Sequence, residues 1–134
     1  MTSPAASTTP HSTMDVARTL VALCREGKND EAIHTLYAPD IVSIEASGGD
    51  ETMPREMHGM DAVVAKGKWW VDNHEVHDST VGGPWPHDDR FIVTFRYDVT
   101  NKPSGKRFMM EEAALYTVRD GKIAREEFFY SMGG

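Results

Sequence analysis

Residues 74–77 read His-Glu-Val-His and precede Asp78, a combination of side chains that can bind zinc. The zinc-protease signature, however, places its two histidines four residues apart on one helix. Here they are three residues apart, and the helical pattern before them ends near Asn73. On a strand, His74 and His77 would point to opposite faces. The spacing favours a polar helix-to-strand junction with no metal bound, although His74 stays a candidate for the mouth of a ligand pocket.

Three glutamates are candidates for acid–base catalysis: Glu45, Glu112 and Glu126. Each lies in or beside a segment with a strand pattern, so each faces either an interior pocket or solvent. A carboxyl group buried among apolar side chains has a raised pKa and can move a proton at neutral pH. Glu45 could instead lie on the outer sheet face or near a loop. For the other two, the alternative is a solvated pairing with an arginine, the candidates being Arg96, Arg107 and Arg125.

Three helices are expected in the first 73 residues. The first begins at Ser12 or Thr13, either of which can cap it, and ends at Gly27. A shorter helix follows, with Asp30 as its cap and Pro39 at its end. The third covers residues 58–73, and Trp70 lies on the side of this helix that is expected to face the interior.

The remaining segments have strand and turn patterns. A β-branched run over residues 40–46 predicts a strand, and residues 47–56 predict a polar loop. Strands are then expected over 75–83, 90–99, 106–118 and 122–132, with a turn at 84–89 and a hairpin at Arg-Asp-Gly. The predicted fold class is α+β: a strongly curved antiparallel sheet packed against three N-terminal helices, forming a cone-shaped pocket.

Length and composition restrict the classes of protein. A chain of 134 residues with 40% apolar residues fits one domain, over residues 13–134. Residues 1–12 predict a disordered tail, or an arm that packs on a neighbouring subunit. The net charge of −7 without a basic cluster argues against nucleic acid, and no apolar run reaches the roughly 18 residues of a membrane span. The single Cys24, expected to be buried and inert, suggests a cytoplasmic location.

A family resemblance follows from two stretches, "DEAIHTLYAPDIVSIEASGG" with "MHGMDAV", and "ALYTVRDGKIAREEFFY". Over residues 14–132 the chain resembles the SnoaL-like and ketosteroid-isomerase-like branch of the nuclear-transport-factor-2-like superfamily. The resemblance implies a curved sheet wrapped around a conical pocket, and a homodimer formed through the outer sheet face. It implies little about the reaction, because this fold hosts cyclases, isomerases, dehydratases and non-catalytic binding domains.

The catalytic residues of ketosteroid isomerases carry over only in part. Glu45 falls where these enzymes have the carboxylate that shuttles the proton. The tyrosine that donates to the substrate oxygen is replaced by Leu20, and the protonated aspartate by Ala113 or Ala114. Loss of even one such donor commonly costs about 100-fold in rate, so ketosteroid isomerisation by that mechanism is not expected.

The pocket lining follows from the period of two in the strands and from the family register, which turns Tyr116 and Glu112 inward. Phe95, Phe128 and Trp70 are of types that more often form simple core than ligand contacts. The predicted ligand-binding residues are Tyr37, Trp70, His74, Phe95, Tyr97, Met110, Tyr116, Phe128 and Tyr130.

Two functions remain open. One is an enzyme without a cofactor, in which a glutamate moves a proton on a small, mostly apolar, carbonyl-bearing molecule, as in isomerases, cyclases and dehydratases. The other is a non-catalytic ligand-binding or dimerisation module of the same fold. A homodimer is expected in both cases, because the outer sheet face carries Ile92, Met109, Leu115 and Phe129.

Overall fold

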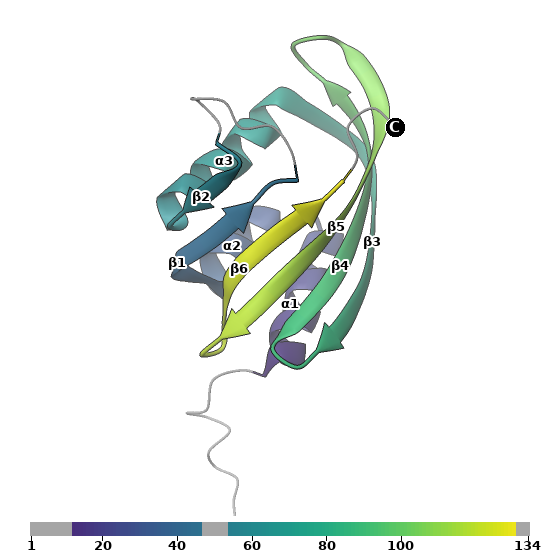
Figure 1. Ribbon diagram of the computed structural model, residues 1–134. Helices are drawn as coiled ribbons and strands as arrows, with labels where there is room; N and C mark the ends of the chain where they lie inside the picture. Colours follow the sequence, from purple (N-terminus) through teal and green to yellow (C-terminus); the bar gives the residue numbers. More distant parts are fainter. Residues whose placement is uncertain (1–11, 47–53, 131–134) are drawn as a thin grey trace, which may run out of the picture.

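The chain folds as three helices and a six-stranded sheet in the parts that the computed structural model describes, residues 12–46 and 54–130 (Figure 1). The predicted tail lies outside the described residues, apart from Ser12. The helices are α1 (Thr13–Arg25), α2 (Asn29–Leu36) and α3 (Met60–Asn73). The strands are β1 (Tyr37–Ile44), β2 (Glu56–His58), β3 (His74–His87), β4 (Arg90–Asn101), β5 (Lys106–Arg119) and β6 (Lys122–Phe129).

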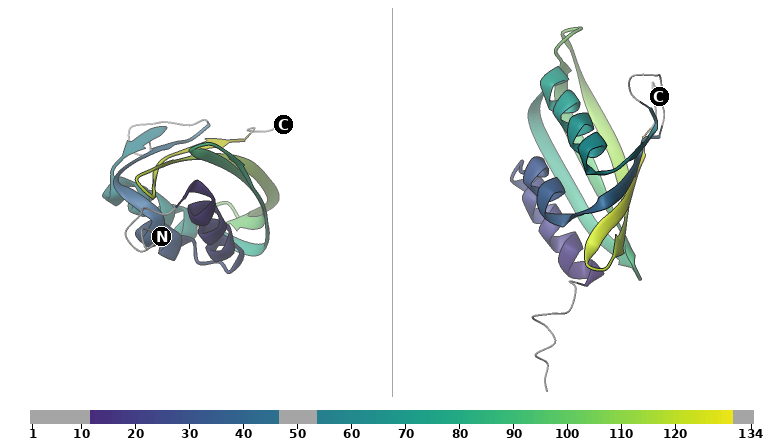
Figure 2. Two further views of the ribbon diagram at one scale, coloured as in Figure 1. Left: turned by 90° about the horizontal axis from the view of Figure 1, so that it is seen from below. Right: turned by 90° about the vertical axis from the view of Figure 1, so that its left-hand side faces the viewer.

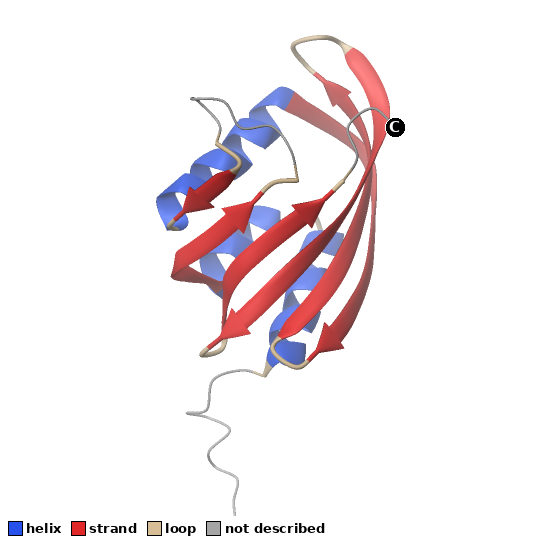
Figure 3. Cartoon of the chain, viewed as in Figure 1, coloured by secondary structure: helices blue, strands red, loops and turns tan. Residues whose placement is uncertain are grey.

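The sheet is strongly curved and has the strand order β2-β1-β6-β5-β4-β3. Its concave face wraps around α1, and all three helices lie on that side (Figures 2 and 3). Neighbouring strands are antiparallel except β1 and β6, which run parallel. The α+β fold predicted from the sequence is therefore confirmed, with one parallel pair inside the otherwise antiparallel sheet. None of the described helices is long and apolar enough to cross a membrane.

The sequence accounts for α1 at both ends. The Ser12 hydroxyl accepts a hydrogen bond from the Asp15 amide at 3.1 Å and so caps the first turn. After the last turn Gly27 takes a φ of +74°, a conformation in which a side chain would be strained. Between them, the helix buries Val16 and Leu20 against the sheet.

The second helix and the first strand correct two predictions. Asp30 lies inside the first turn of α2 and not at its cap, and the helix ends at Leu36, before Pro39. β1 starts at Tyr37 because pairing with Ile123 of β6 already extends the chain there. The predicted loop over 47–56 includes residue 56, which opens the short strand β2; residues 47–53 lie outside the described ranges.

The turn predicted over residues 84–89 begins later than expected, at Asp88, because β3 continues through Pro84 and Pro86 to His87. Proline removes a backbone donor, and β3 tolerates this because it lies at the sheet edge and pairs only with β4. The chain reverses instead at Asp88, which has a φ of +55°. The Arg-Asp-Gly hairpin between β5 and β6 is confirmed.

The core lies between the concave face and α1, where Phe91, Val93 and Ala114 are almost fully buried. Phe91 stacks on Tyr116 of the next strand with ring centroids 4.9 Å apart. Because Tyr116 also lines the cavity described below, the core and the cavity wall share one layer of side chains.

We expect Phe91→Ala to lower the free energy of unfolding by about 3–5 kcal/mol, because it removes a fully buried ring and leaves a void. Urea unfolding measures the change. Phe108→Ala is the control, since Phe108 is 37% exposed, and it should cost far less. Equal losses in the two variants would contradict this description of the core.

Candidate functional site

A cavity of about 920 Å³ lies between the concave sheet face and the helices. Its walls are mainly apolar and aromatic, which suits an organic molecule of modest size. All the residues predicted from the sequence as catalytic or ligand-binding line it except His74. They come from β1, α3, β4, β5 and β6 or the residues directly after β1 and β6, and are Tyr37, Glu45, Trp70, Phe95, Tyr97, Met110, Glu112, Tyr116, Glu126, Phe128 and Tyr130.

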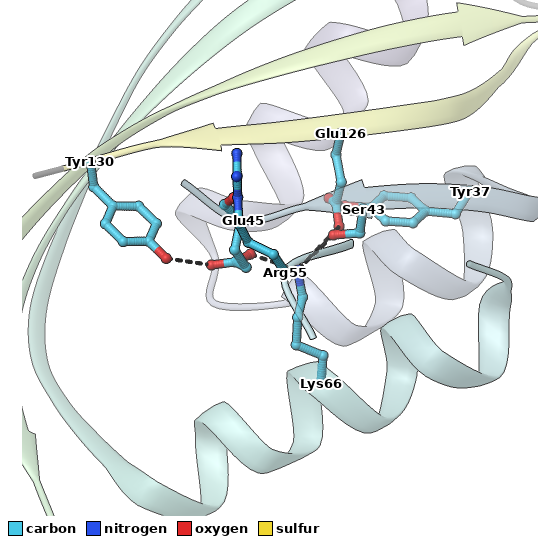
Figure 4. Close-up of polar contacts among 7 residues, drawn as sticks. All are labelled: Tyr37, Ser43, Glu45, Arg55, Lys66, Glu126 and Tyr130. Atoms are coloured by element: carbon cyan, nitrogen blue, oxygen red, sulfur yellow. Dashed lines mark hydrogen bonds and ion pairs between the residues drawn. The ribbon is translucent and has the colours of Figure 1, made fainter. Parts of the chain in front are cut away.

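Lys66 forms an ion pair with Glu45 at the end of the cavity that we call its floor, made by Ser43, Glu45, Lys66 and Glu126. It lies one turn after the buried Val63 on α3, so its side chain extends along the same face toward the sheet. Its ammonium group donates to Glu45 Oε2 at 2.7 Å and to Ser43 Oγ at 2.6 Å (Figure 4). With only 16% of the Lys66 side chain exposed and 25% of that of Glu45, water screens this pair much less than a surface ion pair.

The backbone of Glu45 is fixed beside the pair. Glu45 exchanges hydrogen bonds with Arg55: its amide donates to the Arg55 carbonyl at 2.8 Å, and the Arg55 guanidinium donates to the Glu45 carbonyl at 2.8 Å. The Tyr130 hydroxyl donates to Glu45 Oε1 at 2.9 Å. Both carboxylate oxygens of Glu45 are therefore hydrogen-bonded, which makes it a poor candidate for a catalytic base.

Glu126 is buried and held in place by the parallel pairing of β1 with β6. Its register partner Ser43 donates to Oε2 at 2.7 Å, and the Tyr37 hydroxyl donates to Oε1 in a short hydrogen bond. Burial raises the pKa of Glu126, while Lys66 and the two hydrogen bonds oppose that shift. Burial and the nearby Glu126 together raise the pKa of Tyr37, so its hydroxyl keeps its proton.

Glu112 differs from the other two carboxyl groups. It lies on β5 beside Phe95 of β4 and faces the cavity, and no described residue makes a hydrogen bond to its side chain. Burial, with a smaller contribution from Glu45, raises its pKa to about 7, against the opposing attraction of Lys66. A carboxyl group with this pKa is populated in both its acid and its base form at neutral pH.

An aromatic wall surrounds Glu112. The rings of Phe95 and Tyr97 stack with centroids 5.9 Å apart, and Trp70 packs against Tyr97 at 5.7 Å. Burial raises the pKa of Tyr97, so its hydroxyl stays protonated and can serve as a hydrogen-bond donor. This wall can take the flat apolar body of a ligand and leave its polar atoms near the glutamates.

The histidines of the 74–77 segment do not reach the cavity. The ring of His74 stacks on that of Trp70 with centroids 4.5 Å apart, and its Nδ1 lies 2.9 Å from the Trp70 carbonyl oxygen. His77 pairs instead with Thr100 at 2.7 Å. No group of three or more potential metal ligands occurs within residues 12–46 and 54–130. The two histidines thus hold the helix-to-strand junction, and the prediction that His74 lines the pocket is not met.

The arginines considered as partners of the glutamates also lie elsewhere. Arg96 pairs with Glu111, Arg107 with Asp98, and Arg125 with Glu127. Cys24 is buried, as expected, and burial raises the pKa of its thiol to about 12, so it stays protonated.

Two polar residues of the site were missed from the sequence. Lys66 had a detectable signal, because a lysine at 66 interrupts the apolar stripe formed by Val63 and Trp70 on α3. Ser43 had none, because a serine within a strand is ordinary and its importance depends on the register with Glu126.

Comparison with known proteins gives a consistent picture. A model of the SnoaL-like domain family matches residues 11–130. A Mesorhizobium loti structure, provisionally named a SnoaL-like polyketide cyclase and also carrying the words carbohydrate phosphatase in its name, is 39% identical in sequence. It matches with a TM-score of 0.84 over 90% of this chain and 100% of that one.

More distant structures share the fold alone. An NTF2-like protein from Burkholderia thailandensis has a TM-score of 0.75 and 20% identity, covering 89% of this chain and 90% of that one. A Bacillus subtilis protein provisionally named an isomerase has a TM-score of 0.70 and 17% identity, covering 89% and 86%. The comparison with curated proteins gives no match.

We expect Glu112→Gln to stabilise the protein at pH 8 by on the order of 2 kcal/mol and to have little effect at pH 5. The pKa of Glu112 is higher in the folded than in the unfolded chain, so its contribution to stability is complete below its ordinary pKa of 4.5 and is lost as pH rises through about 7. Glutamine resembles the protonated form and removes this loss.

Urea unfolding at both pH values measures the difference. Glu111→Gln on the same strand is the control, because the Glu111 side chain is 72% exposed. If Glu112→Gln is no more stabilising at pH 8 than at pH 5, Glu112 does not have the raised pKa described above.

Proposed function

The chain belongs to the SnoaL-like domain family, and from that premise we propose that its cavity binds a small, mostly apolar, carbonyl-bearing molecule on which Glu112 acts as acid and base. The observation that carries the proposal is a cavity-facing carboxyl group with no hydrogen-bond partner among the described residues and a pKa near neutrality. A partnered carboxylate such as Glu45 would have to break hydrogen bonds before it could react.

The charges of the cavity support a neutral ligand. Four carboxyl groups line it, those of Asp30, Glu45, Glu112 and Glu126, against the single cation Lys66 among the described lining residues, and that cation is already paired with Glu45. A phosphate or carboxylate ligand would meet net repulsion. The charges therefore disfavour a phosphatase activity for this chain, although the name of the Mesorhizobium loti structure carries the words carbohydrate phosphatase.

The proposed step is a proton transfer at carbon. The Glu112 carboxylate takes a proton from the carbon next to the ligand carbonyl, the electron pair of the broken C–H bond forms a C=C bond, and the carbonyl π pair moves to oxygen. The Glu112 carboxylic acid then returns the proton, to the same carbon or to a conjugated one. Isomerases, cyclases and dehydratases share this enolate stage, and the step as written requires no cofactor.

A non-catalytic binding module is the second candidate. It is supported by Leu20 and by Ala113 or Ala114, the apolar residues at the two positions where the family resemblance would place oxyanion donors. The cavity and the cavity-facing Glu112, which has no hydrogen-bond partner among the described residues, favour the enzyme, because a dimerisation module would gain nothing from an unpaired acid there.

We also propose a homodimer formed through the outer sheet face. Ile92, Met109 and Phe129 are 40%, 50% and 52% exposed there, and Trp85, the register partner of Ile92, is 55% exposed. Large apolar side chains gathered on one sheet face are typical of a subunit interface. A cytoplasmic location stays a prediction from the single reduced cysteine.

The protein should accelerate exchange of the α-protons of 2-tetralone, a neutral bicyclic ketone, for deuterium in heavy water. Glu112→Gln should slow this exchange by roughly 100-fold or more, because it removes the base. The rate should rise with pH and reach half its maximum near pH 7, as the carboxylate forms. Proton NMR follows the exchange, and ligand-observed NMR follows binding.

Glu111→Gln is again the matched control and should exchange at the rate of the natural protein. Binding of 2-tetralone without any acceleration over buffer would establish the non-catalytic module. Equal rates in the natural protein and Glu112→Gln would show that another group is the base.

Sedimentation should give a species of roughly twice the 14.9 kDa chain mass. Ile92→Lys places a charge on the outer face and should yield the monomer, whereas Val76→Lys, at an exposed residue on the cavity side, should leave the dimer intact. A monomeric natural protein at high concentration would refute the proposed interface.

A further inference from the structure

Lys66 carries a charge that the proposed reaction can use. Its side chain comes from α3 and meets the floor of the cavity between Glu45 and Ser43 (Figure 4). It is the one cationic side chain among the described residues lining the cavity. Its ammonium nitrogen also lies 4.8 Å from the centre of the Phe128 ring, a cavity-lining residue of β6.

The hydrogen bonds of Lys66 leave one donor available for a ligand. An ammonium group has three N–H donors. Two are used by Glu45 Oε2 and Ser43 Oγ. The next carboxylate oxygen, Glu126 Oε2, is 4.0 Å away, beyond hydrogen-bonding distance. The two bonds fix the position of the ammonium group, so a ligand oxygen would meet a preorganised donor and not a flexible chain.

We propose that Lys66 donates a hydrogen bond to the carbonyl oxygen of the ligand and stabilises the negative charge that forms there when Glu112 removes the proton. The inference deepens the proposed function and rests on it. It assigns an electrophilic role to Lys66 and restricts the substrate to molecules that place a carbonyl oxygen at α3 and an acidic C–H at β5.

The electrostatics of the transfer favour this arrangement. Before the step, the negative charge is on Glu112; after it, Glu112 is neutral and the charge is on the ligand oxygen. Charge therefore moves toward the ammonium group and away from β5, without creating a second anion beside Glu112. An ammonium-to-oxyanion hydrogen bond in a cavity of low polarity is among the stronger interactions available to a protein.

Lys66 also fills a gap in the site. Leu20 and Ala114, buried on α1 and β5, cannot donate a hydrogen bond. The Tyr97 hydroxyl can also donate there, but a neutral hydroxyl stabilises an enolate less than an ammonium group does. The alternative is that Lys66 serves only to neutralise Glu45. That structural role predicts no preference for an ionised ligand over a neutral one, which makes the two roles separable.

The test uses 2-naphthol, whose ionised form has the shape and charge of the enolate of 2-tetralone, and its neutral ether 2-methoxynaphthalene. Both are measured in a Glu112→Gln background, because glutamine represents the neutral acid present after proton transfer. Absorbance titration gives the pKa of bound 2-naphthol. We expect adding Lys66→Met to raise that pKa by about one unit, a tenfold loss of naphtholate binding, and to change binding of the ether less than twofold.

Two variants keep the result interpretable. Glu45→Gln with Lys66→Met removes the ion pair as a unit, so that no unpaired Glu45 charge destabilises the fold, and it should lose naphtholate binding to the same extent. Lys68→Met is the control, because Lys68 is 76% exposed and pairs with Asp72, and it should bind both probes normally.

The outcomes separate this inference from the proposed function. If the ether binds but the pKa of bound 2-naphthol is the same with and without Lys66, the role of Lys66 is refuted and the proposed function stands. If neither probe binds even with Lys66 present, both are refuted.

Discussion

The structure depends on placing Glu45, Glu112 and Glu126 around one cavity with a single lysine to balance them. Lys66 neutralises Glu45, and Ser43 links that pair to Glu126 through hydrogen bonds of 2.6 and 2.7 Å. Burial raises the pKa of Glu126, against the opposing effects of Lys66 and of the hydrogen bonds from Tyr37 and Ser43. Glu112 is left as the carboxyl group whose charge no neighbour fully compensates. The reactivity that we propose for Glu112 thus follows from how the other two carboxyl groups are paired.

The fold provides this balance through the curvature of the sheet and the position of α3. Curvature brings β1, β5 and β6 around the same space, and the parallel pairing of β1 with β6 sets Ser43 directly beside Glu126. Helix α3 then closes the cone, inserting Lys66 beneath the sheet and Trp70 against Tyr97. A shift of β1 by one residue would turn Ser43 to the other face and leave Glu126 without one of its donors.

Much of this was predictable from the sequence, for physical reasons. The period of two placed Glu112, Tyr116 and Phe95 on one face, and the resemblance to SnoaL-like proteins indicated which face is inside. The pairing within the floor was not predictable, because hydrogen bonds between Lys66, Ser43 and Glu126 depend on a long-range register that local patterns do not encode. For the same reason the sequence pattern predicts that this strand ends before Pro84, whereas β3 continues to His87. Only its position at the sheet edge explains why the prolines are tolerated.

The most direct test of the account is the pKa of Glu112 itself, measured by NMR titration of the protein labelled with ¹³C at the glutamate carboxyl carbons, with Glu112→Gln to assign the resonance. We predict a midpoint at about 7. A midpoint near the ordinary value of 4.5 would show that Glu112 is solvated like a surface carboxylate, and it would contradict the assignment of acid–base chemistry to this cavity.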